Sequence, residues 1–159
     1  MQTREDRKRK RNRERTQVAA QLQDLTTDEH VLEMKRYIQH GRISTYAHCE
    51  EVALASYRIN RRLHLKADEK VLLRAAMLHD FYLYDWHDND GTHPLHGYRH
   101  ADQAMENAKR FFHIGETEQM AIWSHMWPLN ITRLPRTREA WILCIADKLV
   151  SFEETVLKR

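Results

Sequence analysis

Apolar residues recur at a spacing of three or four along most of the chain, which is the spacing of one face of an α-helix. After a polar leader, this pattern begins at about Thr27 and runs to His40, with Thr27 as a candidate N-cap and Gly41 as a stop signal. The next helix is expected to open at Ser44 or Thr45. Cap and stop residues act within one helical turn, so they predict where a helix begins or ends and not how the helices pack.

The other predicted helices are marked by a cap or a stop residue at one or both ends. They are a helix capped by Asp68, a helix from about Leu95 to Phe112 that Gly115 stops, a shorter helix that Thr117 caps and that ends at Pro128, and a last helix capped by Thr137. The segment from Phe81 to Pro94 breaks the periodicity and is interpreted as a loop. No segment shows a period of two, so the sequence predicts an all-α bundle of six or seven helices.

Charge divides the chain into two parts. Residues 1–16 contain eight Lys and Arg against three Asp and Glu, a net charge of +5, whereas the remainder has 18 basic and 20 acidic residues and a net charge of −2. We therefore expect a basic, flexible arm over residues 1–16 and a single helical domain over 17–159. The arm could contact nucleic acid, but a solvated, partly helical leader is the favoured interpretation, because it has no aromatic residue to stack on a base.

Composition excludes several classes of protein. Hydrophobic residues make up 42% and charged residues 31% of the chain, which is typical of a globular protein. Two cysteines, Cys49 and Cys144, provide no disulfide framework. The longest apolar run, Ala140 to Ala146, is far shorter than the roughly 20 residues that span a bilayer. With no apolar segment in the basic leader to suggest a secretory signal, a cytoplasmic protein is expected.

Several ionisable residues fall on the apolar sides of predicted helices, where an unpartnered polar group is costly. They are His48, His79, Asp80, His125 and Asp147. A single metal site would satisfy all of them. Imidazole nitrogen and carboxylate oxygen suit Mn, Fe, Co, Ni, Zn or Mg, and the lack of thiolates in the set argues against a structural zinc site.

The order of these residues resembles the HD-domain superfamily of metal-dependent phosphohydrolases. The resemblance rests on His48 in an early helix, the His79-Asp80 doublet, and Asp147 in an Ile-Ala-Asp-Lys-Leu context, and it extends from about Ile43 to Glu154. It implies an HD-type helical bundle that holds one or two divalent metal ions through His48, His79, Asp80 and Asp147. It also implies an EC 3.1-type hydrolase that cleaves a phosphoester or phosphoanhydride of a nucleotide or another small phosphorylated metabolite.

Two further motifs resemble those of HD proteins with two metal ions. Pro94-Leu-His96-Gly97 and Ile122-Trp-Ser-His125 resemble the histidine motifs that bind the second ion, so the resemblance implies His96 and His125 as ligands, with Asp80 bridging the ions as the catalytic residue. Similar motifs occur in HD hydrolases of dinucleoside polyphosphates. This chain departs from them after His125, where Met-Trp-Pro follows, and its aromatic run at residues 81–86 resembles an uncharacterised bacterial branch.

The sequence contains no glycine-rich phosphate loop, so substrate phosphate is expected to be held by the metal ions and by side chains such as His100, Arg99 and Lys148. The other histidines are expected at the surface: His30, His40, His64, His87, His93 and His113. The alternative function is a catalytically weak HD-fold module that senses or binds a nucleotide, and the basic arm could tether such a module to nucleic acid.

Overall fold

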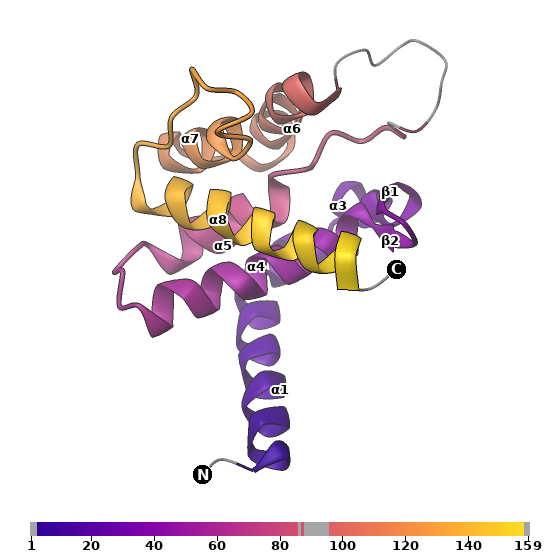
Figure 1. The fold of residues 1–159 in the computed structure, drawn as a ribbon. Coiled ribbons are helices and arrows are strands. Elements are labelled where there is room, and N and C mark those ends of the chain that lie inside the picture. The colour runs from indigo at the N-terminus through magenta and orange to yellow at the C-terminus, as the bar shows by residue number, and fades with distance from the viewer. Residues whose placement is uncertain (1–2, 86, 88–95, 158–159) are drawn as a thin grey trace.

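The computed structural model describes residues 3–85, 87 and 96–157, and their fold is a helical bundle (Figure 1). The described residues form eight α-helices, two short helical segments of other types and one two-stranded sheet. In chain order these are α1 (Arg4–Gln21), α2 (Gln23–Thr26), α3 (Glu29–Glu33), the 3₁₀ turn η1 (Met34–Arg36), β1 (Ile38–His40), β2 (Ile43–Ser44), α4 (Thr45–Arg62), α5 (Glu69–Leu78), α6 (His96–Phe112), α7 (Glu116–Ser124), α8 (Arg138–Phe152) and the π-helical turn η2 (Glu153–Leu157). The predicted all-α class is confirmed.

The core lies where α4, α5, α7 and α8 meet. Helices α4 and α5 form a hairpin, α8 packs across both of them, and α7 packs against α5 and α8 (Figure 1). Fully buried aliphatic residues such as Val52, Leu72 and Leu143 hold these helices together by removing apolar surface from water. In this packing, α4, α5 and α8 each turn one face toward the other two helices.

Three of the predicted helix starts are confirmed by side-chain caps. The hydroxyl of Ser44 accepts a hydrogen bond from the N–H of Ala47 at 3.2 Å, and the carboxylate of Asp68 accepts one from the N–H of Val71 at 3.1 Å. Thr137 caps α8 in the same way. Each cap satisfies a backbone donor that the first turn of a helix leaves without a partner, which is why these starts can be recognised from sequence.

The helix predicted from Thr27 to His40 is wrong after Arg36. It is capped by Asp28, whose carboxylate accepts from the N–H of His30, and helical structure ends at Arg36. The chain then forms the antiparallel hairpin of β1 and β2, in which Gly41 occupies the turn with φ of +58°. A strand of three residues is too short to show a period of two, and glycine at this position serves the turn instead of ending a helix.

The predicted limits of α7 are also wrong. The helix begins after Gly115 instead of at Thr117, because the Glu118 carboxylate accepts a hydrogen bond from the Gly115 N–H at 2.6 Å and so caps the helix from inside. It ends at Ser124, with His125 as its C-cap, instead of at Pro128. Of the predicted loop from Phe81 to Pro94, residues 81–85 and 87 are not helical, and the rest lie outside the described residues.

Helix α1 crosses the boundary predicted between residues 16 and 17. Its first half stands out from the bundle (Figure 1), and its second half contacts α4. In these contacts Glu14 accepts a hydrogen bond from Arg58 at 2.6 Å, and Gln17 accepts one from the hydroxyl of Tyr57 at 2.6 Å. None of the described helices is both long and apolar enough to cross a membrane.

The α4–α5 connection depends on Asn60, which is buried. Its side-chain amide donates to the carbonyl of Ala67 at 3.2 Å and accepts from the N–H of the same residue at 3.1 Å. Within this connection His64 and Lys66 have positive φ, a backbone conformation that costs free energy in residues other than glycine. The two hydrogen bonds of Asn60 offset this strain and fix how α5 leaves α4.

We expect the Asn60→Ala substitution to lower the free energy of unfolding by about 2 kcal/mol, because it leaves the buried N–H and carbonyl of Ala67 without partners. Urea unfolding followed by circular dichroism measures the change. Asn12→Ala, on the exposed part of α1, is the control and should change stability by less than about 0.5 kcal/mol. Equal stability of the two variants would contradict this role for Asn60.

Candidate metal centre

Six histidine and aspartate side chains from five parts of the chain meet in the bundle. His48 comes from α4 and Asp147 from α8; His79 and Asp80 directly follow α5; His100 lies on α6 and His125 directly follows α7. All six are buried, and His48 and His79 are fully enclosed. A buried polar side chain needs a partner, so the contacts of each one must be followed.

His79 and His125 are held in the same manner. Each is the C-cap of its helix, and each has its Nδ1 close to the carbonyl oxygen three residues earlier, at 2.7 Å from Ala76 and 2.6 Å from Ile122. A carbonyl only accepts, so Nδ1 carries the proton and donates it. In the neutral form of each ring, Nε2 therefore has a lone pair that points into the site, which is the tautomer that binds a metal.

His48 is oriented by Glu154, a residue of η2. Its Nδ1 lies 2.8 Å from the Glu154 carboxylate, which is fully buried, so Nδ1 donates to Glu154 and Nε2 points into the site. There Nε2 lies 3.2 Å from Asp147 Oδ1. A carboxylate that accepts from a ligand histidine is a common arrangement around bound metals, because it fixes the ring and strengthens the other nitrogen as a donor.

Four donor atoms surround one point. His48 Nε2 lies 3.2 Å from Asp147 Oδ1 and 3.8 Å from Asp80 Oδ2, and His79 Nε2 lies 3.6 Å and 3.4 Å from the same two oxygens. Ligands about 2.1 Å from one ion are roughly 3.0 Å apart in octahedral and 3.4 Å apart in tetrahedral coordination. The distances between these nitrogens and oxygens suit ligands of one divalent ion, and the ligand atoms of His48, His79 and Asp80 all lie within 4.8 Å of one another.

Three atoms of the site are buried without any hydrogen-bond partner among the described residues: His79 Nε2, Asp80 Oδ1 and Glu154 Oε1. Asp80 Oδ2, by contrast, accepts a hydrogen bond from the Gln39 side-chain amide at 2.7 Å. An orphaned lone pair in the interior costs free energy that a bound cation would recover. The donor set therefore fits a metal on grounds independent of the spacing of its atoms.

The carboxylates make the site favourable for positive charge. Burial lowers the pKa of His48, but hydrogen bonds to Asp147 and Glu154 outweigh it and raise that pKa to about 10. The pKa of His79 is also raised, against the effect of burial, by the charge of Asp80. Burial alone would raise the pKa of Asp80 and Asp147, yet the adjacent histidines hold both pKa values below the ordinary range. Both aspartates are therefore charged at neutral pH, as ligands of a cation must be.

Asp80, His100 and His125 form an adjoining group. His100 Nε2 lies 3.0 Å from His125 Nε2 and 3.2 Å from Asp80 Oδ1, and His125 Nε2 lies 3.6 Å from the same oxygen. Burial, together with the charges of His79 and His100, lowers the pKa of His125 to about 3, so His125 is neutral and accepts a hydrogen bond from His100. These three atoms are close enough to hold a second ion.

The residues predicted to bind substrate are placed differently from one another. His100 and Lys148 both line a cavity of about 710 Å³ that opens onto the site. His100 is buried there beside Asp80 and His125, among the donor atoms. Lys148 also donates to the carbonyl of His125 at 2.9 Å. Arg99 is exposed on α6 and is not among the described residues that line this cavity. His96 is the first residue of α6, and its side chain lies outside the described residues.

Three residues of the site were not recognised in the sequence: Gln39, Glu154 and His40. His40, expected at the surface, is half-buried, and its ring lies 5.5 Å from that of His48. Glu154 follows Asp147 by seven residues, or two helical turns, so helical spacing could have placed it on the same face. Gln39 and His40 had no such signal, because they belong to the unrecognised strand β1.

The fold and the site together define a class of protein: an α-helical bundle with a buried histidine and aspartate centre suited to a divalent metal. The HD domain family model matches residues 45–151, and the chain belongs to this family. The superfamily consists of metal-dependent phosphohydrolases. Searches of curated proteins and of solved structures find no match to the chain.

We expect His79→Ala to remove most of the metal from purified, folded protein grown with added Mn or Fe, because the substitution deletes the orphaned Nε2. Metal per chain, measured by inductively coupled plasma mass spectrometry on the monodisperse fraction, tests this. His113→Asn is a suitable control, because His113 is exposed at a positive φ that asparagine tolerates. Full metal content in the His79→Ala protein would contradict the proposed ligand set.

Metal binding should also depend on pH. The raised pKa values of His48 and His79 mean that each ring carries an extra proton at neutral pH, which an ion must displace. The apparent affinity for Mn²⁺ should therefore rise as pH rises from about 6 to 9, by up to tenfold per pH unit for each proton released. Isothermal titration calorimetry in buffers of different ionisation enthalpy counts the protons. Glu154→Gln removes one of the groups that raise the pKa of His48 and should reduce the count at pH 8. An affinity independent of pH would contradict the mechanism.

Proposed function

We propose that this protein is a divalent-metal-dependent phosphohydrolase that cleaves a phosphoester or phosphoanhydride bond in a nucleotide or similar small phosphorylated metabolite. The observation that carries the proposal is the set of converging donor atoms, in which three histidines have Nδ1 engaged outward and Nε2 directed inward, against two ionised aspartates. Membership of the HD family supports the same chemistry.

His48, His79, Asp80 and Asp147 are the proposed ligands of the first ion. Asp80, His125 and His100 are proposed for a second ion, with His96 as the further ligand that the family resemblance implies. This arrangement gives His100 the role of a ligand in place of the substrate contact expected from sequence. When bound, the metal would polarise a phosphoryl oxygen and make water more acidic.

Asp80 is the proposed catalytic residue. Gln39 donates to its Oδ2, and Tyr82 in turn donates to the amide oxygen of Gln39 at 2.5 Å, so the carboxylate is fixed in orientation. Oδ1 would either help to hold a second ion with His100 and His125 or, where only the first ion is bound, accept a hydrogen bond from an attacking water. Because the pKa of Asp80 is held low, this oxygen suits orientation of the water better than permanent uptake of its proton.

The adjoining cavity supports a substrate of small-molecule size. Its volume of about 710 Å³ lies within the ordinary range of ligand pockets. Lys148 supplies a positive charge for phosphate on one side of it. Met126, Pro128 and Leu129 line another part, where their apolar surfaces suit a base or another non-phosphate group of the substrate.

A screen of nucleotides and sugar phosphates with metal-loaded protein, read out as released phosphate, tests the proposal. For a substrate found in this way, Asp80→Asn should reduce turnover to background. Lys148→Met should lower kcat/KM by about 10- to 100-fold, because a charge-assisted hydrogen bond to phosphate is lost, while metal content is kept.

Lys109→Met is the matched control for Lys148→Met, since Lys109 is exposed on α6 and pairs only with Glu106 among the described residues. It should leave kcat/KM unchanged. Metal-loaded protein that binds nucleotides but hydrolyses none of them would contradict the proposal and favour a sensor module. Undiminished turnover by the Asp80→Asn protein would contradict the role of Asp80.

A further inference from the structure

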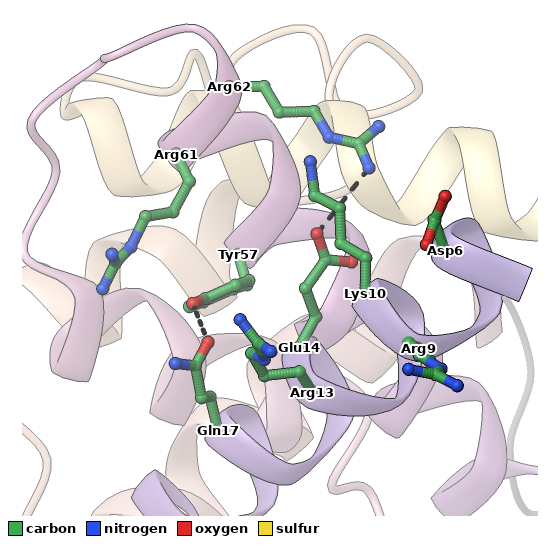
Figure 2. Close-up of a pocket in the computed structure, with 9 residues that line it drawn as sticks. All are labelled: Asp6, Arg9, Lys10, Arg13, Glu14, Gln17, Tyr57, Arg61 and Arg62. Atoms are coloured by element: carbon green, nitrogen blue, oxygen red, sulfur yellow. Dashed lines mark hydrogen bonds and ion pairs between the residues drawn. The ribbon is translucent and has the colours of Figure 1, made fainter. Parts of the chain in front are cut away.

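A second cleft lies between α1 and the C-terminal end of α4. It has a volume of about 540 Å³ and is lined by charged side chains around Tyr57 (Figure 2). On α4, Arg61 lies 13 residues from His48, which is about 20 Å along the helix. The cleft shares no lining residue with the cavity at the metal centre, so any function it has is separate from the proposed hydrolysis.

The cleft carries an excess of positive charge. Its lining contains five cationic and two acidic side chains: Arg9, Lys10, Arg13, Arg61 and Arg62, with Asp6 and Glu14. The charge of Glu14 is already paired. Its carboxylate lies 2.6 Å from Arg58 and 3.8 Å from Arg62, the pair drawn in Figure 2. Lys10 and Arg13 form no ion pair with any described residue, and both are exposed side chains of α1 that line the cleft (Figure 2).

The same excess continues along the projecting half of α1. Six of its cations make no ion pair with a described residue: Arg4, Arg7, Lys8, Lys10, Arg11 and Arg13. Like charges recur one turn apart, as in Arg4 with Lys8 and Arg7 with Arg11, and such pairs destabilise an isolated helix. A bound polyanion would relieve this repulsion.

We propose that α1 and the adjoining end of α4 bind the phosphate backbone of double-stranded DNA, without regard to its sequence. Residues 3–17 contain no apolar side chain, so this helix has nothing to insert into a lipid surface. They also contain no aromatic ring, and Tyr57, the one aromatic ring lining the cleft, lies under the guanidinium of Arg61 and donates to Gln17. Stacking on single-stranded bases is therefore not favoured.

The shape of α1 favours a DNA duplex over an RNA duplex. A helix with its side chains is about 10–12 Å wide, and the major groove of B-DNA is about 12 Å wide, whereas the major groove of A-form RNA is narrow and deep. Every residue from Arg4 to Arg13 is exposed, so cations face both walls of such a groove. Six of the eight cations in residues 4–15 are arginine, the side chain best matched to phosphate oxygens.

Fluorescence anisotropy of a labelled 20-base-pair DNA of arbitrary sequence, titrated with the full chain at several KCl concentrations, tests this proposal. Six phosphate contacts should give a slope of log affinity against log salt concentration of about −5. The triple variant Arg7→Gln, Lys10→Gln, Arg13→Gln should weaken binding at 100 mM KCl on the order of 100-fold and reduce the slope by about three.

The triple variant Lys70→Gln, Arg110→Gln, Arg136→Gln is the matched control, because it removes the same charge from exposed positions elsewhere. It should bind DNA as the unmodified chain does, and thermal unfolding should show that both variants are folded. Four results would overturn the proposal: no binding at 50 mM KCl, equal losses in the two variants, tighter binding to single-stranded DNA or duplex RNA of the same length, or tighter binding to phosphatidylserine vesicles.

Discussion

The structure depends on keeping two aspartates, Asp80 and Asp147, ionised in the interior of a helical bundle. A buried carboxylate without compensation would take up a proton, so each must be matched by positive charge or by hydrogen-bond donors. Four histidines, His48, His79, His100 and His125, face these oxygens. The pKa values of His48, His79 and His125 are shifted by the carboxylates and by burial. A divalent cation would supply the same positive charge. The need to compensate these two carboxylates explains why helices that are distant in sequence all end at, or pass through, the metal centre.

The positions of the histidines follow from ordinary helix geometry. His79 and His125 are C-cap residues, so each ring can reach a carbonyl of its own last turn and is thereby fixed in tautomer. His48 lies inside a helix, where those carbonyls are already used, and it takes a carboxylate from Glu154 instead. The same result, a lone pair directed inward, is therefore reached by two different local means.

The metal centre and helix α1 use charge in opposite ways. At the centre, the carboxylates and imidazoles are buried and close together, so each one has defined neighbours. Along α1, the cations are exposed, repeated and mostly unpaired, so their field reaches into solvent. A buried centre of this kind selects a small ligand by geometry, whereas an exposed row of charge selects a long polyanion by its field. The two proposed functions rest on separate residues for this reason.

The sequence by itself determined the helical class, the start of three helices, and the order of histidines and aspartates that identifies the family. These features are local: a cap at Ser44 or Asp68 acts within one turn, and an ionisable residue on an apolar stripe is visible in the pattern. Only the tertiary structure decided that Glu154, Gln39 and His40 belong to the centre, and that His100 lies among the donor atoms. The hairpin that carries Gln39 is held by contacts with Asp80 and Tyr82, residues more than 40 positions away. A strand of three residues is too short to show an alternating pattern of apolar and polar residues. The conformation of β1 is set by its packing against the rest of the chain and not by local preference.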